Sequence, residues 1–438
     1  MRKGIELDID IIKALNWLSS VIEEPKHFLK RMEDAQKKYI EETSKKNNIG
    51  KKFDNKWYGD DVVAGFFSQA KSLTDNRRAF EISTASQIIP WVKQLGQNID
   101  LLKNIPGADD RAKRMIINKT VYPDTALFEL ILAGNYAAIG YDVEFIPEKK
   151  GVAKTPEFKC CVEGEDVFFV ECKRLQKGQY AIQEEKAHDL RAHFAKLRVD
   201  LKRMTVWMDV TYKCEVQESP ENYLVKHLSN YCGKEMHWDD EFGYGFIKPR
   251  SLNLVKNDII KNGSLSLHTK LARLIKGAPL EDAYYNVFAY GRMDERDARF
   301  ISKVSYATLL TWRCISDKSL EGRSRHVKST LSEIEKQIAE NGFGIGHIAM
   351  DVDVQRDVAD KRRVKNIAVI NEFNLQSMLL SLNIHYLVPR IDENHSWLVD
   401  ETLDDFHSIR PADYTVPTVK IFPDGKIFEN DLPGWHQK

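Results

Sequence analysis

Four charged side chains lie in or beside apolar segments, where packing alone would not place a charge. Glu129 lies inside an apolar run, Glu157 opens a strand-like segment, and Glu171 ends another apolar run two residues before Lys173. Charges at the end of a buried strand are costly unless they are satisfied. A divalent cation removes that cost, because carboxylate oxygens are natural ligands for Mg²⁺. We therefore expect Glu157 and Glu171 to share a metal ion and Glu129 to supply a further ligand. Lys173 would position or activate a water molecule, or offset phosphate charge.

Residues 125–175 contain the elements that would position these side chains. The helical spacing of the apolar residues, with a typical helix stop at Gly140, predicts a helix. Three strand-like runs separated by glycine-containing turns follow, at residues 143–145, 158–162 and 167–173. Alternate residues of a strand share a face, so Glu171 and Lys173 should point the same way.

This constellation resembles the PD-(D/E)XK superfamily of nucleases, which is also called the restriction-endonuclease-like fold. The matching residues are Pro156-Glu157, then Glu171-Cys172-Lys173, with Glu129 on the preceding helix. The first acidic position of the family is usually Asp, and here it is Glu157, whose extra methylene lengthens the ligand arm.

The resemblance implies both a fold and a chemistry. The fold would be an α/β restriction-endonuclease-like core, a central mixed sheet flanked by helices. The activity would be hydrolysis of phosphodiester bonds, with Mg²⁺ or Mn²⁺ held by Glu157, Glu171 and the backbone carbonyl of Cys172. Lys173 would orient the attacking water or stabilise developing charge, and Glu129 would complete or support the metal shell. The expected enzyme is a DNA endonuclease acting in restriction, anti-phage defence or repair.

The fold also needs a second helix and a fourth strand. Two segments compete for this role, residues 179–211 and residues 327–352. We favour the later one, because its run GIGHIAMDV is apolar throughout, as a buried central strand should be. The resemblance then makes Lys336 and Gln337 candidates for a basic or amide residue lent to the site by the second helix.

The remaining chain is expected to add domains around this core. The predicted organisation is a helical N-terminal domain (1–120), a first part of the nuclease core (121–211), a large mixed α/β insertion (212–326) and a core-completing C-terminal region (327–438). Within the last region we expect a loop at 353–363 and a helix at 371–382. The N-terminal domain would either grip substrate or a partner, or serve as a helical cap over the sheet.

A basic helix is predicted at 179–203, directly after the motif. It carries Lys186, His188, Arg191, His193, Lys196, Arg198, Lys202 and Arg203. Such a helix could face a phosphate backbone. However, acidic residues are interspersed among the basic ones, which favours the alternative that this helix face is exposed to solvent and binds no phosphate.

Charge and composition limit the partners. The chain has 438 residues, with 65 Lys and Arg against 65 Asp and Glu, so the formal net charge is zero. This balance excludes a wholly basic surface, and nucleic-acid contact must depend on a local patch or on a protein partner that delivers the substrate. No apolar run approaches membrane-spanning length and no signal peptide opens the chain, so no membrane contact is expected. Scattered cysteines suit reduced thiols and predict a cytoplasmic protein.

Two alternatives from other functional classes stay open. The chain could be a catalytically silent nuclease fold that acts as a binding or scaffold subunit. It could also be a nuclease subunit that is active only within a partner complex. A homodimer is compatible with each of these interpretations.

Overall fold

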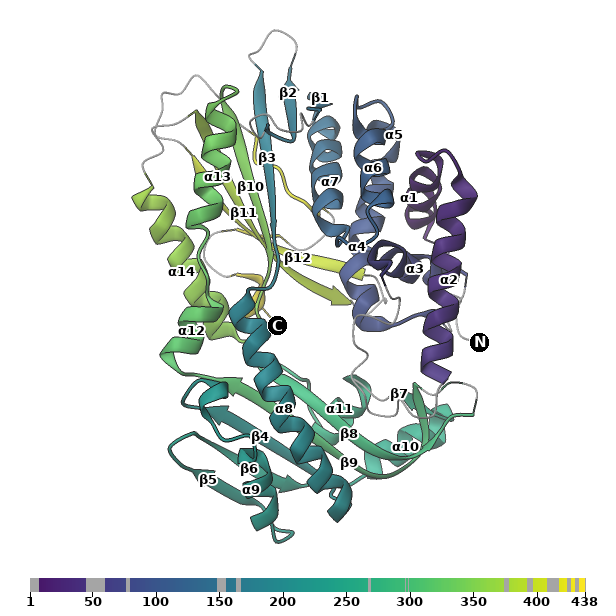
Figure 1. The fold of residues 1–438 in the computed structure, drawn as a ribbon, viewed down its shortest axis with the longest axis vertical. Coiled ribbons are helices and arrows are strands. Elements are labelled where there is room, and N and C mark those ends of the chain that lie inside the picture. Colours follow the sequence, from purple (N-terminus) through teal and green to yellow (C-terminus); the bar gives the residue numbers. More distant parts are fainter. Residues whose placement is uncertain are drawn as a thin grey trace.

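Two mixed β-sheets organise the chain, and helices cover each of them (Figure 1). The computed structural model describes residues 8–44, 60–75, 79–147, 155–162, 167–266, 269–295, 297, 299–373, 378–391, 397–407, 417–423, 427–429 and 433–437. Within these residues, no helix combines the length and the apolar character needed to cross a membrane. The architecture confirms the α/β class predicted from the sequence.

The first sheet has the strand order β1-β2-β3-β10-β11-β12-β13. Its strands are β1 (Asp142–Phe145), β2 (Phe158–Cys161), β3 (Phe168–Leu175), β10 (Gly344–Asp351), β11 (Leu379–Ile391), β12 (Trp397–His407) and β13 (Ile427–Glu429). The first three pair antiparallel, whereas β10 is parallel to both β3 and β11. Every residue of β10 except Asp351 is buried. Helix α7 (Asp124–Ala138) precedes β1, which confirms the predicted order of one helix and three strands.

Helices pack on both faces of the first sheet. The N-terminal helices share one hydrophobic core with α7 and with Val170 and Cys172 of β3. These helices are α1 (Ile9–Ser20), α2 (Pro25–Ser44), α3 (Val62–Thr74), α4 (Ile82–Gln97), α5 (Ile99–Leu102) and α6 (Ala108–Ile117). On the opposite face, α13 (Lys328–Ala339) and α14 (Arg356–Glu372) form a second core with β10 and β11. The N-terminal helices therefore reach the sheet directly.

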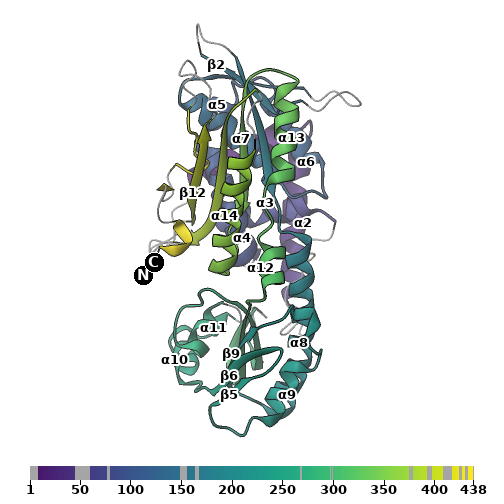
Figure 2. The same cartoon turned by 90° about the vertical axis from the view of Figure 1, so that its left-hand side faces the viewer.

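The second sheet lies beyond one end of the first and has the order β5-β6-β4-β9-β7, with β8 paired to β9 (Figure 2). Its strands are β4 (Val206–Tyr212), β5 (Met236–Asp239), β6 (Gly243–Pro249), β7 (Leu265–Ser266), β8 (Tyr284–Met293) and β9 (Phe300–Cys314). Helices α8 (Gln179–Lys202) and α9 (Tyr223–Asn230) pack on one side of it. Helices α10 (Asn253–Asn262) and α11 (Thr269–Lys276) pack with β7 and β9 in a separate core.

The sheet pairing decides between the two segments that competed to follow β3. The 327–352 segment supplies α13 and β10, and β10 pairs directly with β3. The 179–211 segment instead supplies α8 and β4, and β4 pairs with β6 and β9 of the second sheet. The chain therefore leaves the first sheet at the start of α8, and the boundary expected at 211 falls inside β4.

Two local predictions near the C-terminus were wrong. Residues 353–363 were expected to be a loop, but α14 begins at Arg356 within them. Residues 371–382 were expected to be helical, but the helix ends at Glu372 and β11 begins at Leu379. The physical reason lies in α14, whose buried side includes the polar Asn366. This side chain accepts from the Val327 N–H at 3.1 Å and donates to the Tyr386 hydroxyl at 2.9 Å.

Candidate functional site

Strand β3 presents Glu171 and Lys173 on one face. Glu171 is fully buried, and the Lys173 Nζ lies 2.5 Å from its Oε1. The alternate residues, including Val170 and Cys172, face the core on the other side. Burial opposes the charge on Lys173, but the Glu171 carboxylate, with smaller contributions from Glu157 and Glu333, raises the pKa of Lys173. Lys173 is therefore held as a cation, which can donate hydrogen bonds but cannot take up a proton.

Glu157 stands at the entry to β2 and is fixed there through its backbone. Its N–H donates to the Val170 carbonyl of β3 at 3.0 Å, and its carbonyl accepts from the Ile146 N–H at 3.0 Å. Its side chain is about one-fifth exposed. The backbone of Glu157 is thus held beside the strand that carries Glu171.

Glu129 comes from α7, where every residue from 127 to 136 is buried. A helix that is apolar all round is a core helix, and a charge within it needs a partner. Glu129 is 1% exposed and pairs with the Arg111 guanidinium. Burial raises the pKa of Glu129 well above its usual range, and the charges of Glu157 and Glu171 add to this rise against the opposing effect of Arg111. The three carboxylates are therefore close enough to repel one another.

Arg111 is the site residue that the sequence interpretation missed. It lies on α6 of the N-terminal helices, and its Nη2 contacts Glu129 and lies 3.5 Å from the Glu157 Oε2. The residue before α6, Gly107, has φ 85°, and a Cβ there would lie 2.8 Å from the Cβ of Phe145. The Phe145 N–H also donates to the Pro106 carbonyl at 3.0 Å. This close approach of α6 to β1 places Arg111 over the carboxylates.

The two candidates on α13 lie differently. Gln337 is 6% exposed, and its Nε2 donates to the Thr155 carbonyl at 3.2 Å, two residues before Glu157. Its buried Oε1 has no hydrogen-bond partner among the described residues. Lys336 is exposed to solvent instead. One turn earlier on the same helix, Glu333 contributes to the raised pKa of Lys173. Gln337 is thus the α13 side chain with a free acceptor near the site.

The oxygen atoms gathered at this site are of the type that binds a divalent cation, but their present arrangement does not form a metal site. Three carboxylates and the acceptor oxygen of Gln337 are the hard oxygen ligands that Mg²⁺ and Mn²⁺ prefer. However, no three His, Cys, Asp or Glu side chains in the described part of the chain are arranged to hold a metal. Two of the carboxylates that would be ligands are instead in contact with the Arg111 guanidinium. A cation could use Glu129 and Glu157 only after Arg111 leaves them. The role of the Cys172 carbonyl stays a prediction.

Helix α8 does not present one continuous basic face beside the site. Two of its basic residues, His188 and Arg191, are buried. The Arg191 Nε donates to the Ser219 hydroxyl at 2.7 Å, and the His188 Nδ1 lies 3.2 Å from the Tyr212 hydroxyl. Lys196 pairs with Asp200 at 2.6 Å within the helix. Several charges that suggested a phosphate-binding helix therefore serve the packing of the second sheet.

Known proteins give no independent indication of function. The chain matches no protein-family model, no curated protein and no solved structure. The assignment of a function therefore depends on the geometry of the site.

Proposed function

We propose that this chain is a metal-dependent nuclease built on a restriction-endonuclease-like core. The observation that carries the proposal is the gathering of Glu129, Glu157, Glu171 and Lys173 on one structural unit. That unit runs helix α7, strands β1 to β3, helix α13 and strand β10, with β10 parallel to β3. This order is the one that the resemblance in sequence predicts.

The roles of the residues follow from their environments. Glu157, Glu171 and the Cys172 carbonyl would hold Mg²⁺ or Mn²⁺, with Glu129 completing or supporting the shell. The ion would polarise the scissile phosphate and lower the pKa of an attacking water. Lys173 is a partly exposed cation that contacts Glu171, so it would orient that water or stabilise charge that develops on the phosphate.

The position of Arg111 supports a functional role for the N-terminal helices, because α6 contributes this side chain to the site. Once displaced from Glu129 and Glu157, its guanidinium would remain next to them, because α6 is fixed against β1. A guanidinium there can bind a phosphate oxygen of the substrate in the two-pronged manner that arginine favours. We propose DNA as the substrate, in restriction, anti-phage defence or repair in the cytoplasm. With a net charge of zero, a protein partner that delivers the DNA is part of this proposal.

The pairing of Arg111 also favours the alternative of a silent subunit. An arginine that permanently neutralises Glu129 and Glu157 would leave a nuclease fold without metal, which could still serve as a binding or scaffold subunit. It would equally suit a nuclease that becomes active only when a partner or substrate draws Arg111 away.

The test combines metal binding with cleavage on purified variants. Wild type, Glu171→Ala and Lys173→Ala are titrated with Mn²⁺ by calorimetry and incubated with single- and double-stranded DNA and RNA, with and without a chelator. Glu144→Ala is the matched control, because Glu144 is a glutamate of the same sheet that pairs with Lys159 at the surface. We expect Glu171→Ala to lose Mn²⁺ binding and cleavage while Glu144→Ala keeps both.

Lys173→Ala separates chemistry from structure in the same experiment. We expect cleavage to fall by about 10²-fold or more, the scale for losing a positioned electrostatic group. Mn²⁺ affinity should stay within a few-fold, since lysine is not a ligand. With Mn²⁺ bound the melting temperature should not fall, because the ion then compensates the buried Glu171 carboxylate that Lys173 pairs with in the metal-free protein. Cleavage that is equal in wild type and Glu171→Ala would refute the nuclease assignment. Metal binding without any cleavage would favour the alternative in which the chain is a catalytically silent subunit.

A further inference from the structure

Helix α8 carries two apolar stripes, and only one of them is covered. The first, which includes Ala192, Ala195 and Val199, packs in the core of the second sheet. The second consists of Leu190, Phe194, Leu197 and Leu201, which are spaced by four, three and four residues. Its leucines are 41%, 54% and 73% exposed, in chain order. Apolar residues at this spacing form the contact seam when one helix packs along another.

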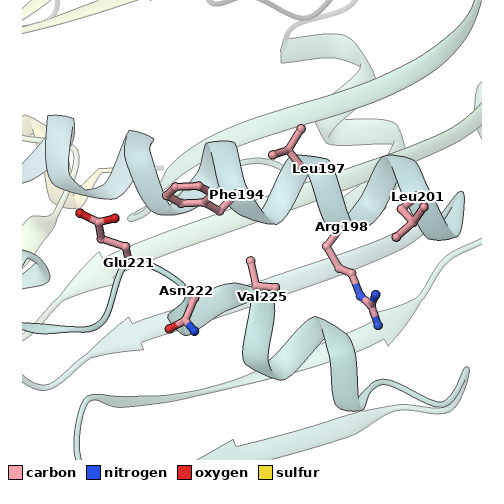
Figure 3. Close-up of a pocket in the computed structure, with 7 residues that line it drawn as sticks. All are labelled: Phe194, Leu197, Arg198, Leu201, Glu221, Asn222 and Val225. Atoms are coloured by element: carbon pink, nitrogen blue, oxygen red, sulfur yellow. The ribbon is translucent and has the colours of Figure 1, made fainter.

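The second stripe forms one wall of a groove. The groove has a volume of about 540 Å³ (Figure 3). It is lined by Phe194, Leu197, Arg198 and Leu201 of α8, by Glu221 and Asn222 just before α9, and by Val225 of α9. Arg198 and Glu221 lie well apart along the groove, with Phe194, Leu197 and Val225 between them and Leu201 beyond Arg198. The Arg198 Nε is buried and has no hydrogen-bond partner in the described part of the chain. The groove thus offers an apolar centre with one positive and one negative end.

We propose that a second copy of this chain occupies the groove, with the two α8 helices antiparallel about a twofold axis. A surface with opposite charges at its two ends is complementary to itself when turned by a twofold rotation. If the twofold axis passes between Phe194 and Leu197, then Phe194 of each copy contacts Leu197 of the other copy. In the same arrangement, Leu190 of one copy contacts Leu201 of the other, so the dimer contains four apolar contacts between the two α8 helices. The twofold rotation also brings Arg198 of each copy toward Glu221 of the other.

The overall shape allows this arrangement. Helix α8 has 24 residues, which is about 36 Å, and its C-terminal end lies at the end of the second sheet far from the first (Figures 1 and 2). An antiparallel pair sends the two first sheets in opposite directions, so they do not collide. A net charge of zero adds no overall repulsion between copies. The seam is short, and we expect a dimer with a dissociation constant on the order of 1–100 μM.

The first experiment measures mass against concentration. Sedimentation velocity of the full chain at about 1–200 μM, a range that brackets this affinity, should show monomers giving way to dimers. Leu197→Asp should keep the chain monomeric, with an unchanged melting temperature, because Leu197 is more than half exposed. Ile260→Asp is the control, since Ile260 of α10 is 82% exposed but lies outside the groove. It should dimerise as wild type does.

A charge exchange then tests the twofold pairing. Arg198→Glu and Glu221→Arg should each weaken the dimer by about tenfold, since each places like charges together twice. An equimolar mixture of the two variants should associate again, because the mixed pair restores both opposite-charge contacts. A chain that stays monomeric at every concentration would overturn the proposal, and so would a dimer insensitive to Leu197→Asp. Failure of the mixture to recover would overturn the antiparallel geometry. None of these outcomes depends on nuclease activity.

Discussion

Arg111 links the N-terminal helices by charge to two of the carboxylates at which we propose that a metal ion binds. If its guanidinium competes with a cation for Glu129 and Glu157, Arg111→Met should raise Mn²⁺ affinity by about tenfold, since about 1.4 kcal/mol of competing interaction is removed. Without metal the same variant should melt at a lower temperature, because the buried Glu129 loses its partner. Mn²⁺ should then raise the melting temperature more than in wild type.

Calorimetry and thermal melting with and without Mn²⁺ check this prediction. Arg111→Lys is the conservative control and should bind Mn²⁺ as wild type does, because it keeps the positive charge. Unchanged Mn²⁺ affinity in Arg111→Met would show that the arginine does not compete with metal. A fall in cleavage despite tighter metal binding would place Arg111 on the substrate.

Individual residues differ in how far the sequence could reveal them. Glu129, Glu171 and Lys173 stand out because each interrupts an apolar pattern, and charges in apolar segments require a partner. Arg111 does not stand out, because it lies in a short helix rich in charges. Its role depends on Gly107 and Pro106 bringing α6 onto β1, a contact between elements that residue spacing does not encode.

Strands β10, β11 and β12 are joined across the sheet by a buried chain of polar groups. The Tyr136 hydroxyl lies 2.9 Å from the His347 Nε2, the His347 Nδ1 lies 2.9 Å from the His385 Nε2, and the His385 Nδ1 lies 2.5 Å from the Glu401 Oε1. Burial, together with the neighbouring His385, lowers the pKa of His347 well below its usual range. Glu401 also accepts the N–H groups of Ile421 and Phe422. One carboxylate thus holds the C-terminal segment against the sheet.

Glu401→Ala should therefore loosen the C-terminal segment. It leaves two backbone N–H groups and His385 without their acceptor, which costs about 1–3 kcal/mol for each buried group. We expect a clear fall in the free energy of unfolding, and faster amide exchange at Ile421 and Phe422 than elsewhere in the sheet. Glu340→Ala, at an exposed position after α13, is the control. Protection of Ile421 and Phe422 equal to that of wild type would contradict this role.

Elements whose apolar residues form a clear pattern in the sequence could be predicted. Elements whose packing depends on polar side chains could not. β10 is one unbroken apolar run, so its burial follows from the sequence. Helix α14 buries only a few apolar residues, among them Ala359 and Ile370, and adds polar and charged contacts to them. Arg363, for example, pairs with Asp404 of β12 at 2.7 Å. Such a helix shows only a weak apolar stripe, and its first residues, 356–363, were predicted to be part of a loop.

On the scale of the whole molecule, two arginines of the described residues, Arg299 and Arg323, help to attach the second sheet to the rest. Arg299 at the start of β9 reaches the N-terminal helices, where its guanidinium donates to the Phe80 carbonyl and lies over the Tyr39 ring. The other attachment surrounds Arg323 of α12 (Asp317–Arg323), which lies between β9 and α13. These contacts join segments far apart in the sequence, so the sequence indicated an insertion but not how it docks.

Arg323 brings together three parts of the chain at this junction. Its fully buried guanidinium pairs with Glu184 of α8 at 2.8 Å and with Asp353, after β10, at 3.3 Å. It also donates to the Tyr284 hydroxyl of β8. Burial opposes its charge, but the neighbouring carboxylates raise the pKa of Arg323. This guanidinium therefore links α8 and β8 of the second sheet to the segment that follows β10 of the first sheet.

Arg323→Met should cause the two sheets to unfold in separate transitions. Removing one partner of a buried ion pair leaves Glu184, which is also fully buried, uncompensated at a cost of about 3–5 kcal/mol. Because that loss falls at the junction, we expect differential scanning calorimetry to resolve two transitions where wild type shows one. Lys318→Ala on the same helix is the control and should leave the trace unchanged, since Lys318 pairs only at the surface. Glu184→Met added to Arg323→Met should recover part of the loss, because the uncompensated charge is then gone. A single transition at the wild-type temperature in Arg323→Met would show that the junction is held by packing and not by this cation.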